Sequence, residues 1–244
     1  MTLRLFIPLD AAALAVGADD VAAGIKAAAA QQNAAVDIVR TGSRGLYWLE
    51  PMVEAETPSG RVAYGPVMPA DAEGLLTALL AEGAHKLGLG PTEEIPWLKR
   101  QTRLTFARCG IVDPRSLDDY HAHSGGKGLA KALALGPEAI VEEVAQSGLR
   151  GRGGAGFPTG IKWRTVAQTK GPQKYIVCNA DEGDSGTFAD RMIMEGDPFV
   201  LIEGMAIAGI ATEATTGYVY IRSEYPHAIA AMEAAIACGY SERI

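Results

Sequence analysis

The sequence predicts a mixed α/β protein built in two parts. Short apolar runs alternate with longer alanine- or leucine-rich stretches, which is typical of strands followed by helices. The pair Gly90-Pro91 interrupts this alternation and indicates a boundary. The chain has 244 residues, which is enough for one large or two smaller domains. We therefore expect one domain over residues 1–90 and a second over residues 91–244.

The first part reads as three kinds of element: single strands, a hairpin and two helices. The expected elements are a strand Leu3–Ile7, an alanine-rich helix capped by Asp19 and Asp20 and running to about Asn33, a strand Val36–Arg40, a hairpin of Met52–Thr57 and Arg61–Tyr64, and a helix Asp71–His85 with Leu75, Leu76, Leu79 and Leu80 inward. This β-α-β-β-β-α order resembles a thioredoxin-like domain. Because no cysteine precedes Cys109, we expect this domain to hold no cluster ligands and to act as a docking scaffold.

The second part begins with a linker and continues as alternating helices and strands. The expected elements are an amphipathic segment Thr92–Arg108, short helices over Leu129–Leu135 and Pro137–Ser147, a buried strand Lys174–Cys178, an apolar helix Pro198–Ile210, a strand Gly217–Ile221 and a helix ending near Cys238. Its expected fold is a Rossmann-like α/β domain.

A glycine-rich stretch, Ser147–Trp163, is the most informative part of the sequence. It contains six glycines, and no Asp or Glu lies between Glu143 and Asp181. Successive backbone N–H groups in such a loop can form an anion-binding nest, and the basic residues around it add positive charge. A flexible linker is the alternative, but the loop also carries Phe157 and Trp163, whereas Gly/Ser linkers are polar. We read the stretch as a phosphate cradle.

Two generic phosphate motifs do not fit this loop. Gly151, Gly153 and Gly156 match the dinucleotide fingerprint, but that fingerprint follows a strand and the segment before this loop reads as a helix. A P-loop would need Gly-Lys followed by Ser or Thr, whereas Ile161 separates Gly160 from Lys162.

An acidic turn follows the expected strand 174–178. Seven acids and only Arg191 as a base occur between Asp181 and Glu203, whereas six bases and no acid occur between Val144 and Ala180. Binding sites of α/β folds lie at the carboxyl ends of strands. A basic lobe beside an acidic one suits a ligand with phosphates at one end and hydroxyls at the other. Two solvated faces of opposite charge remain the alternative.

Composition excludes several classes of function. The net charge of −7 argues against nucleic acid as a partner. The three cysteines, Cys109, Cys178 and Cys238, form no C-x-x-C pair and suggest a reducing compartment. The run Asp118–His123 is read as a helix start and not as a metal site. No apolar run approaches a membrane span, so we expect a soluble, cytoplasmic protein.

The whole stretch G-R-G-G-A-G-F-P-T-G-I-K-W resembles a specific family. It is similar to the FMN- and NADH-binding subunit of respiratory complex I and its soluble relatives, which include NAD-reducing hydrogenases and NAD-dependent molybdenum formate dehydrogenases. The run Asn179–Glu182, N-A-D-E, and the run Arg222–Pro226, R-S-E-Y-P, resemble two further signatures of the family.

The resemblance implies a set of cofactor-binding residues and no catalytic side chain, because FMN carries the chemistry. Those implied for FMN are Gly151, Arg152, Gly153, Gly154, Lys162, Asn179, Asp181, Glu182, Tyr220, Ser223 and Glu224. Those implied for NADH are Phe157, Glu182 and Asp184. Three positions depart from the family's usual residue: Asp184 stands for Glu, Thr165 for Phe and Ser223 for Gly.

The resemblance also implies a function and partners. Hydride would pass between NAD(H) and FMN, and electrons would pass to iron–sulfur clusters of partner subunits. The cysteine-free front and the run N-A-D-E-G-D-S-G-T-F-A-D-R most resemble the β subunit of formate dehydrogenase, with iron–sulfur and molybdenum subunits as partners. The alternatives are a diaphorase of a hydrogenase or of a complex I-like enzyme, and a flavin-free docking fragment. The family's C-terminal domain, with a 4Fe–4S cluster, is expected outside this chain.

Overall fold

The computed structural model describes residues 2–242, and the chain divides into two compact units. Unit 1 comprises Met1–Ser116 and Met192–Asp197, and unit 2 comprises Leu117–Arg191 and Pro198–Ile244. The residue 116/117 division differs from the boundary expected at Gly90, because the segment after Pro91 packs with unit 1. The division into functional domains 1–90 and 91–244 stays a prediction.

Unit 1 is a five-stranded sheet with helices. Its elements are β1 (Leu3–Pro8), α1 (Ala11–Ala15), α2 (Ala18–Gln31), β2 (Val36–Thr41), the 3-10 turn η1 (Tyr47–Leu49), β3 (Val53–Thr57), β4 (Gly60–Tyr64), η2 (Pro69–Asp71), α3 (Ala72–Leu80), β5 (Gly88–Pro91), η3 (Thr92–Glu94) and α4 (Pro96–Lys99). The strand order is β2-β1-β3-β4-β5, in which β1 and β2 are parallel and the other pairs antiparallel. The mixed α/β class is confirmed.

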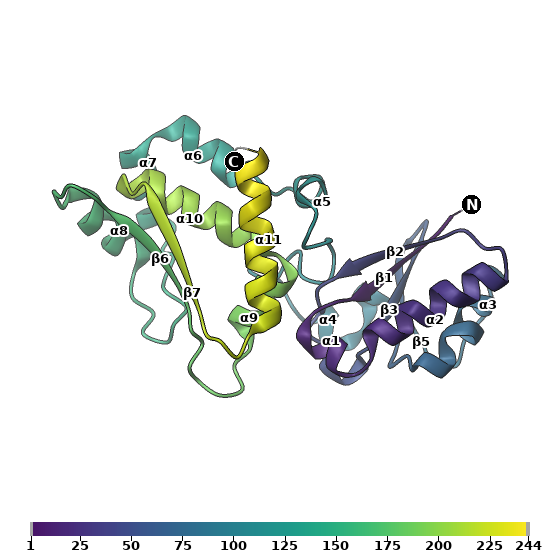
Figure 1. Ribbon diagram of the computed structural model, residues 1–244. Helices are drawn as coiled ribbons and strands as arrows, with labels where there is room; N and C mark the ends of the chain where they lie inside the picture. The colour runs from purple at the N-terminus through teal and green to yellow at the C-terminus, as the bar shows by residue number, and fades with distance from the viewer. Residues whose placement is uncertain (1, 243–244) are drawn as a thin grey trace. The chain divides into compact units, whose positions relative to one another are not determined.

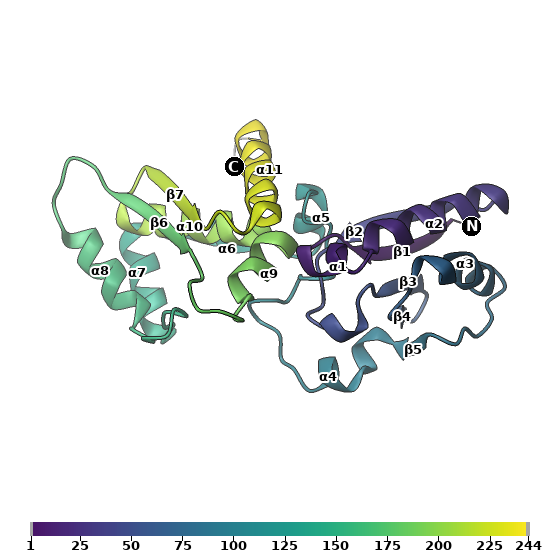
Figure 2. The ribbon, with the colours of Figure 1, turned by 60° about the horizontal axis from the view of Figure 1, so that its bottom comes forward.

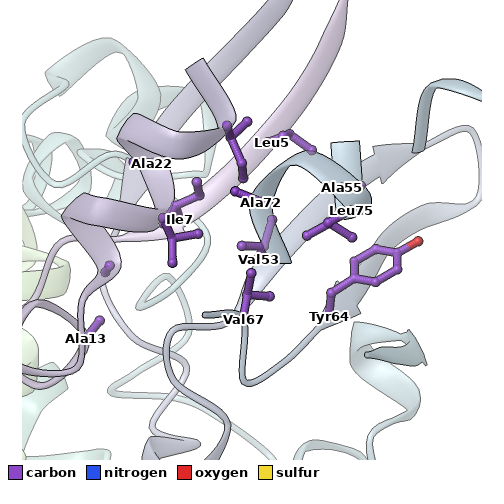
Figure 3. Close-up of a cluster of buried hydrophobic side chains, with 13 residues drawn as sticks. Leu5, Ile7, Ala13, Ala22, Val53, Ala55, Tyr64, Val67, Ala72 and Leu75 are labelled. Atoms are coloured by element: carbon purple, nitrogen blue, oxygen red, sulfur yellow. The ribbon is translucent and has the colours of Figure 1, made fainter. Parts of the chain in front are cut away.

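The core of unit 1 lies between this sheet and the helices α2 and α3, which lie side by side over the sheet in Figure 1. Leu5 and Ile7 of β1 and Val53 of β3 are fully buried and meet Ile25 of α2 and Leu75 of α3. Figure 3 shows side chains of this cluster converging from strands and helices onto one apolar layer. Burial of this kind is the main force that holds the unit together.

Several element boundaries in unit 1 differ from the sequence prediction. Asp19 and Asp20 lie in the first turn of α2 and do not cap it, since the N-cap is Gly17 in a left-handed conformation. Asp10 instead caps the unexpected helix α1 by accepting from Ala12 N at 3.2 Å. The helix α3 ends at Leu80, which is exposed, because the chain turns at Glu82 with φ 50°.

Unit 2 holds two parallel strands among helices. Its elements are α5 (Leu117–Ala122), α6 (Lys127–Leu135), α7 (Pro137–Gln146), α8 (Thr159–Gln168), β6 (Tyr175–Ala180), the start of α9 (Ala189–Gly196), α10 (Pro198–Thr212), β7 (Thr216–Ile221) and α11 (Pro226–Glu242). The helix that was expected before the glycine loop is present as α7. Figure 2 shows α7 and α8 side by side.

The pair β6–β7 is covered on one face only. Ile176 of β6 and Val219 of β7 turn toward Met205 of α10, whereas Val177 and Tyr218 on the other face are about 60% exposed. The expectation of a buried strand is therefore right for one face of β6 and wrong for the other. Within residues 2–242, no helix is long and apolar enough to cross a membrane.

Candidate functional site

The glycine loop connects α7 to α8 and folds back on itself. Gly151 N donates to Phe157 O at 2.9 Å, and the Arg150 side chain donates to Gly156 O at 3.0 Å. Gly154 and Gly156 have φ of 97° and 59°, which few side chains tolerate. The glycines are therefore required by the path of the loop.

Most glycines of this loop face open space. A Cβ placed on Gly153, Gly154 or Gly156 would have no described atom within 4 Å. Gly160 is different, because a Cβ there would lie 2.4 Å from Ala145 Cα of α7. Gly160 thus serves the packing of α8 on α7, and the loop glycines leave their backbone open to a ligand.

The first turn of α8 is suited to an anion. Its N-cap, Pro158, offers no side-chain acceptor, and its first turn carries no acidic residue. Backbone N–H groups and the helix dipole make such a terminus favourable for phosphate. Lys162 and Arg152 are exposed, and Lys162 Nζ lies 5.7 Å from the centre of the Phe157 ring. An open glycine backbone leading into an uncapped, basic helix start fits a phosphate-bearing cofactor such as FMN.

The carboxyl ends of β6 and β7 bring predicted residues together. In the parallel register Asn179 lies opposite Tyr220, and Ala180 lies opposite Ile221. Asn179 and Tyr220 are both exposed, so an amide and a phenol stand side by side on the uncovered face of the strand pair. This confirms the expectation that the two sequence signatures meet at one sheet edge.

The turn after β6 is shaped by its own polar side chains. Asn179 Oδ1 accepts from Asp181 N at 3.2 Å. The Glu182 carboxylate accepts from Asp190 N at 2.8 Å and from Arg191 N at 3.1 Å, so it satisfies the first N–H groups of α9. We expected all three carboxylates of this turn to face a ligand crevice; that of Glu182 binds a helix start, and Asp184 is exposed.

The turn after β7 holds a residue that the sequence reasoning did not single out. Arg222 donates to Glu182 O at 3.0 Å and to the Glu224 carboxylate at 3.2 and 3.3 Å. Ser223 Oγ also lies 3.3 Å from that carboxylate. The only signal in the sequence was the position of Arg222 between Tyr220 and Glu224, directly after a strand.

The charges at the strand ends are arranged for ionised carboxylates. Hydrogen bonds from Arg222 lower the pKa of Glu224 below its ordinary value. Burial, with the nearby Glu182 carboxylate, raises the pKa of Asp190. Burial likewise raises the pKa of the Cys178 thiol, which therefore remains a neutral thiol and not a nucleophile.

The predicted residues fall into two groups, one on the glycine loop and one at the strand ends. In Figure 1 the glycine loop between α7 and α8, the turn after β6 and the end of β7 all lie at the lower end of unit 2. A separate apolar groove of about 570 Å³, lined by α10 and α11 residues such as Met205 and Ile236, reaches Thr216 and Gly217 at the start of β7. Its lining is apolar, which does not suit a phosphate.

These features define a class of protein: an α/β nucleotide-cofactor protein with a glycine-rich phosphate loop and polar strand ends. Within the described residues 2–242, no group of three His, Cys, Asp or Glu side chains is placed to hold a metal ion.

Comparisons with known proteins place the chain more closely. Residues 144–243 match the family described as the Nuo51 FMN-binding domain. The chain is 56% identical over 138 residues to the NADP-reducing hydrogenase subunit HndC of Solidesulfovibrio fructosivorans, covering 57% of this chain and 28% of that protein. It is 56% identical over 128 residues to a subunit of the NADH-quinone oxidoreductase of Rhizobium meliloti, covering 52% of this chain and 30% of the relative.

A solved structure also aligns with the chain. The crystal structure of an NAD⁺-reducing [NiFe]-hydrogenase in the air-oxidised state matches with a TM-score of 0.46 and 26% identity, covering 99% of this chain and 41% of the hydrogenase chain. The matched segments span about 30% of the length of the first two relatives. Residues 144–243 belong to the Nuo51 FMN-binding domain family, and the chain is thus a relative of the FMN- and NADH-binding subunits of complex I and their hydrogenase counterparts.

Proposed function

We propose that this chain is the flavin- and NAD(H)-binding part of an electron-transferring oxidoreductase, with FMN held by unit 2. The observation that carries the proposal is the open glycine loop leading into the uncapped start of α8, in the same unit as the paired strand ends. When bound, FMN supplies the hydride and single-electron chemistry. The protein residues bind and orient the two cofactors.

The glycine loop and α8 hold the phosphate end in this proposal. The backbone N–H groups at Gly153 and Gly154, together with Lys162 and Arg152, provide the donors and the positive charge. Asn179, Tyr220 and the Asp181 side chain stand at the strand ends, where they meet the ribityl hydroxyls and the ring edge. Ser223 and Glu224 follow β7 and serve the same ring edge.

The nicotinamide half of NAD(H) is assigned to Phe157 and Asp184. Phe157 is about half exposed and offers an aromatic face, and Asp184 is an exposed carboxylate on the turn after β6. Glu182 contributes through the geometry of its turn, since both of its carboxylate oxygens accept N–H groups of α9.

Unit 1 is proposed as a thioredoxin-like docking scaffold that carries no redox centre. Its strand order, with β1 and β2 parallel and β3 and β4 antiparallel, agrees with the element order on which that resemblance rests. Trp48 and Trp97 are both more than half exposed and pack edge to face with ring centres 5.7 Å apart. Exposed aromatic pairs of this kind are frequent at protein–protein interfaces.

The direct test is a flavin titration of the 244-residue chain. FMN fluorescence is quenched when the flavin enters a protein site, so the titration gives both affinity and stoichiometry. We expect one FMN per chain, and NADH should then bleach the flavin absorbance. A chain that neither quenches FMN nor retains it on a desalting column would contradict the proposal.

The finer proposal concerns the electron donor. We propose a formate dehydrogenase subunit, on the resemblance of the run 179–191 and the absence of cysteine in residues 1–108. A hydrogenase diaphorase is the second candidate, because two relatives carry hydrogenase names, HndC and the NAD-reducing hydrogenase HoxS subunit alpha of Cupriavidus necator. Purification of the native complex, followed by NAD⁺ reduction with formate or with hydrogen, separates the two.

A further inference from the structure

Arg222 connects the two strand ends of the proposed flavin site. It is the first residue after β7 (Thr216–Ile221), and one nitrogen of its guanidinium donates to Glu182 O on the turn after β6. Its other two nitrogens donate to the Glu224 carboxylate at 3.2 and 3.3 Å. A planar guanidinium can hold two acceptors in fixed directions, which an ammonium cannot. The Arg222 side chain therefore fixes the spacing between two turns that carry predicted cofactor residues.

The turn after β6 depends on such support. Glu182 has φ 48°, a left-handed conformation that is rare for residues other than glycine and that persists only where the surroundings fix it. Its carboxylate is fixed by two N–H groups of α9, and its carbonyl oxygen is fixed by Arg222. Loss of the Arg222 bond would release one of these two anchors and let the turn relax away from its strained path.

The guanidinium itself rests on a rigid neighbour. Its centre lies 5.3 Å from the centre of the Tyr225 ring, and Tyr225 is only 8% exposed. Only about a quarter of the Arg222 side chain is exposed, compared with 63% of the Glu224 side chain. The buried ring and the shielded guanidinium together hold the more exposed Glu224 carboxylate in one direction.

We propose that Arg222 is a positioning residue of the flavin site, holding the Glu182 turn and the Glu224 carboxylate in the geometry that receives the flavin ring. This inference rests on the proposed function. It assigns to Arg222 an effect on both flavin affinity and flavin reduction potential, because Glu224 and the turn after β6 stand where the ring edge is expected. A surface ion pair without such a role would contribute little to either quantity.

The test compares three variants of the full chain: Arg222→Ala, Arg222→Lys and the control Lys131→Ala. Lys131 forms an exposed ion pair with Glu143 in the same unit, away from the predicted site residues. FMN affinity is measured by fluorescence quenching, the midpoint potential of bound flavin by a redox titration with reference dyes, and folding by circular dichroism.

Arg222→Ala should weaken FMN binding by roughly tenfold or more, the effect expected for loss of charge-assisted hydrogen bonds, and should shift the flavin midpoint potential. Arg222→Lys should fall between wild type and Arg222→Ala, because lysine keeps the charge opposite Glu224 but cannot hold both acceptors. Lys131→Ala should match the wild type in both quantities.

The outcomes separate the inference from the proposed function. If the wild type does not bind FMN, both are overturned. If the wild type binds FMN and Arg222→Ala retains the wild-type affinity and potential, the inference alone is overturned. If Arg222→Ala does not fold, Arg222→Lys decides: wild-type affinity and potential would overturn the inference, and a weaker, shifted flavin would support it.

Discussion

The glycines of the loop serve two different physical purposes. Gly154 and Gly156 are required by their positive φ, and Gly160 by the close approach of α7. Gly153 has neither constraint, since its φ is not left-handed and a Cβ there would meet no described atom. A glycine that the fold does not need is the best candidate for one that a ligand needs, because only a ligand would fill that space.

Substitution at Gly153 therefore separates binding from folding. Gly153→Val should raise the Kd for FMN by roughly a hundredfold or abolish binding, which corresponds to about 2.7 kcal/mol or more. The free energy of unfolding should change by no more than about 0.5 kcal/mol, as for other exposed substitutions. Fluorescence titration and urea denaturation measure the two quantities.

The matched control is Gly171→Val, in the exposed turn between α8 and β6, where a Cβ would meet only Gln173 O at 3.8 Å. This variant should bind FMN as the wild type does. Equal FMN affinity for the wild type and Gly153→Val would remove the glycine loop from the proposed site.

Charge substitutions distinguish the two cofactors. Asp184→Ala should lower the rate of NADH oxidation with ferricyanide per bound flavin, by roughly ten- to hundredfold, while FMN content stays near that of the wild type. Lys162→Ala should instead reduce FMN content, because Lys162 lies in the first turn of α8 beside the loop. An Asp184→Ala protein that lost its flavin but turned over normally per remaining flavin would reverse the assignment.

Single residues also show where sequence reasoning succeeds. The meeting of Asn179 and Tyr220 follows from two parallel strands, whose carboxyl ends share an edge, and could be predicted. The role of Glu182 could not, because its carboxylate is used by α9, a helix start that has no capping residue in its sequence pattern. Side-chain partners of this kind depend on the path of the turn, which the sequence does not specify.

At the scale of elements, local patterns predicted which segments form helices and strands better than where they end. The helix α7, the strand pair β6–β7 and α10 all appear where apolar periodicity places them. The errors have local causes: a left-handed Gly17 begins α2, and a left-handed Glu82 follows the early end of α3. Such backbone turns interrupt a helix without disturbing the hydrophobic pattern.

One element is held by a single distant carboxylate. Glu203 of α10 accepts from Tyr120 OH, from Gly126 N at 2.8 Å and from Leu129 N at 2.8 Å, so it satisfies the start of α6. Burial alone would raise the pKa of Glu203, but these hydrogen bonds lower it below its ordinary value. The carboxylate therefore stabilises unit 2 when ionised.

Removal of this carboxylate should destabilise unit 2 measurably. Glu203→Gln should lower the free energy of unfolding by about 1–2 kcal/mol at neutral pH, a value reduced for partial exposure of the site. Because the pKa is lowered in the folded state, the difference from the wild type should shrink as pH falls below the ordinary carboxyl range. Urea denaturation at pH 7 and pH 4 tests both points, and a difference that does not depend on pH would contradict the capping role.

At the scale of the whole molecule, the chain contains two units with separate cores. The cluster around Leu5, Ile25 and Leu75 lies in unit 1, and the cluster around Ile140, Val141 and Ala211 lies in unit 2. The sequence predicted two parts, but it placed the boundary near Gly90. Residues up to Ser116 instead pack with unit 1, and Ile95 and Leu98 are buried in a core with Leu46 and Met52.

Unit 1 carries its own pH-sensitive group. Burial raises the pKa of Glu50 from its ordinary value of 4.5 to about 7, although hydrogen bonds from Ser43 and Met52 act against this. The folded state thus binds the proton more tightly than the unfolded chain. The free energy of unfolding should therefore fall as pH rises from about 4.5 to about 7, by about 3 kcal/mol from this group.

Glu50→Gln should remove this dependence, because the amide is neutral at every pH. The difference in stability between Glu50→Gln and the wild type should grow in favour of the variant between about pH 5 and pH 8. Glu73→Gln, which removes an exposed carboxylate of α3, is the control. Parallel pH profiles for wild type and Glu50→Gln would show that Glu50 titrates normally.

FMN should act on the other unit. A ligand that binds only the folded state stabilises it by RT ln(1 + [L]/Kd), about 2.7 kcal/mol at a hundredfold excess over Kd. We therefore expect calorimetry to resolve two transitions, of which FMN raises the midpoint of one and the Glu50→Gln substitution shifts the other. Gly153→Val should abolish the FMN effect and leave both midpoints otherwise in place. A single transition that moves with both FMN and Glu50→Gln would contradict this expectation, because it would mean that the two cores unfold as one cooperative body.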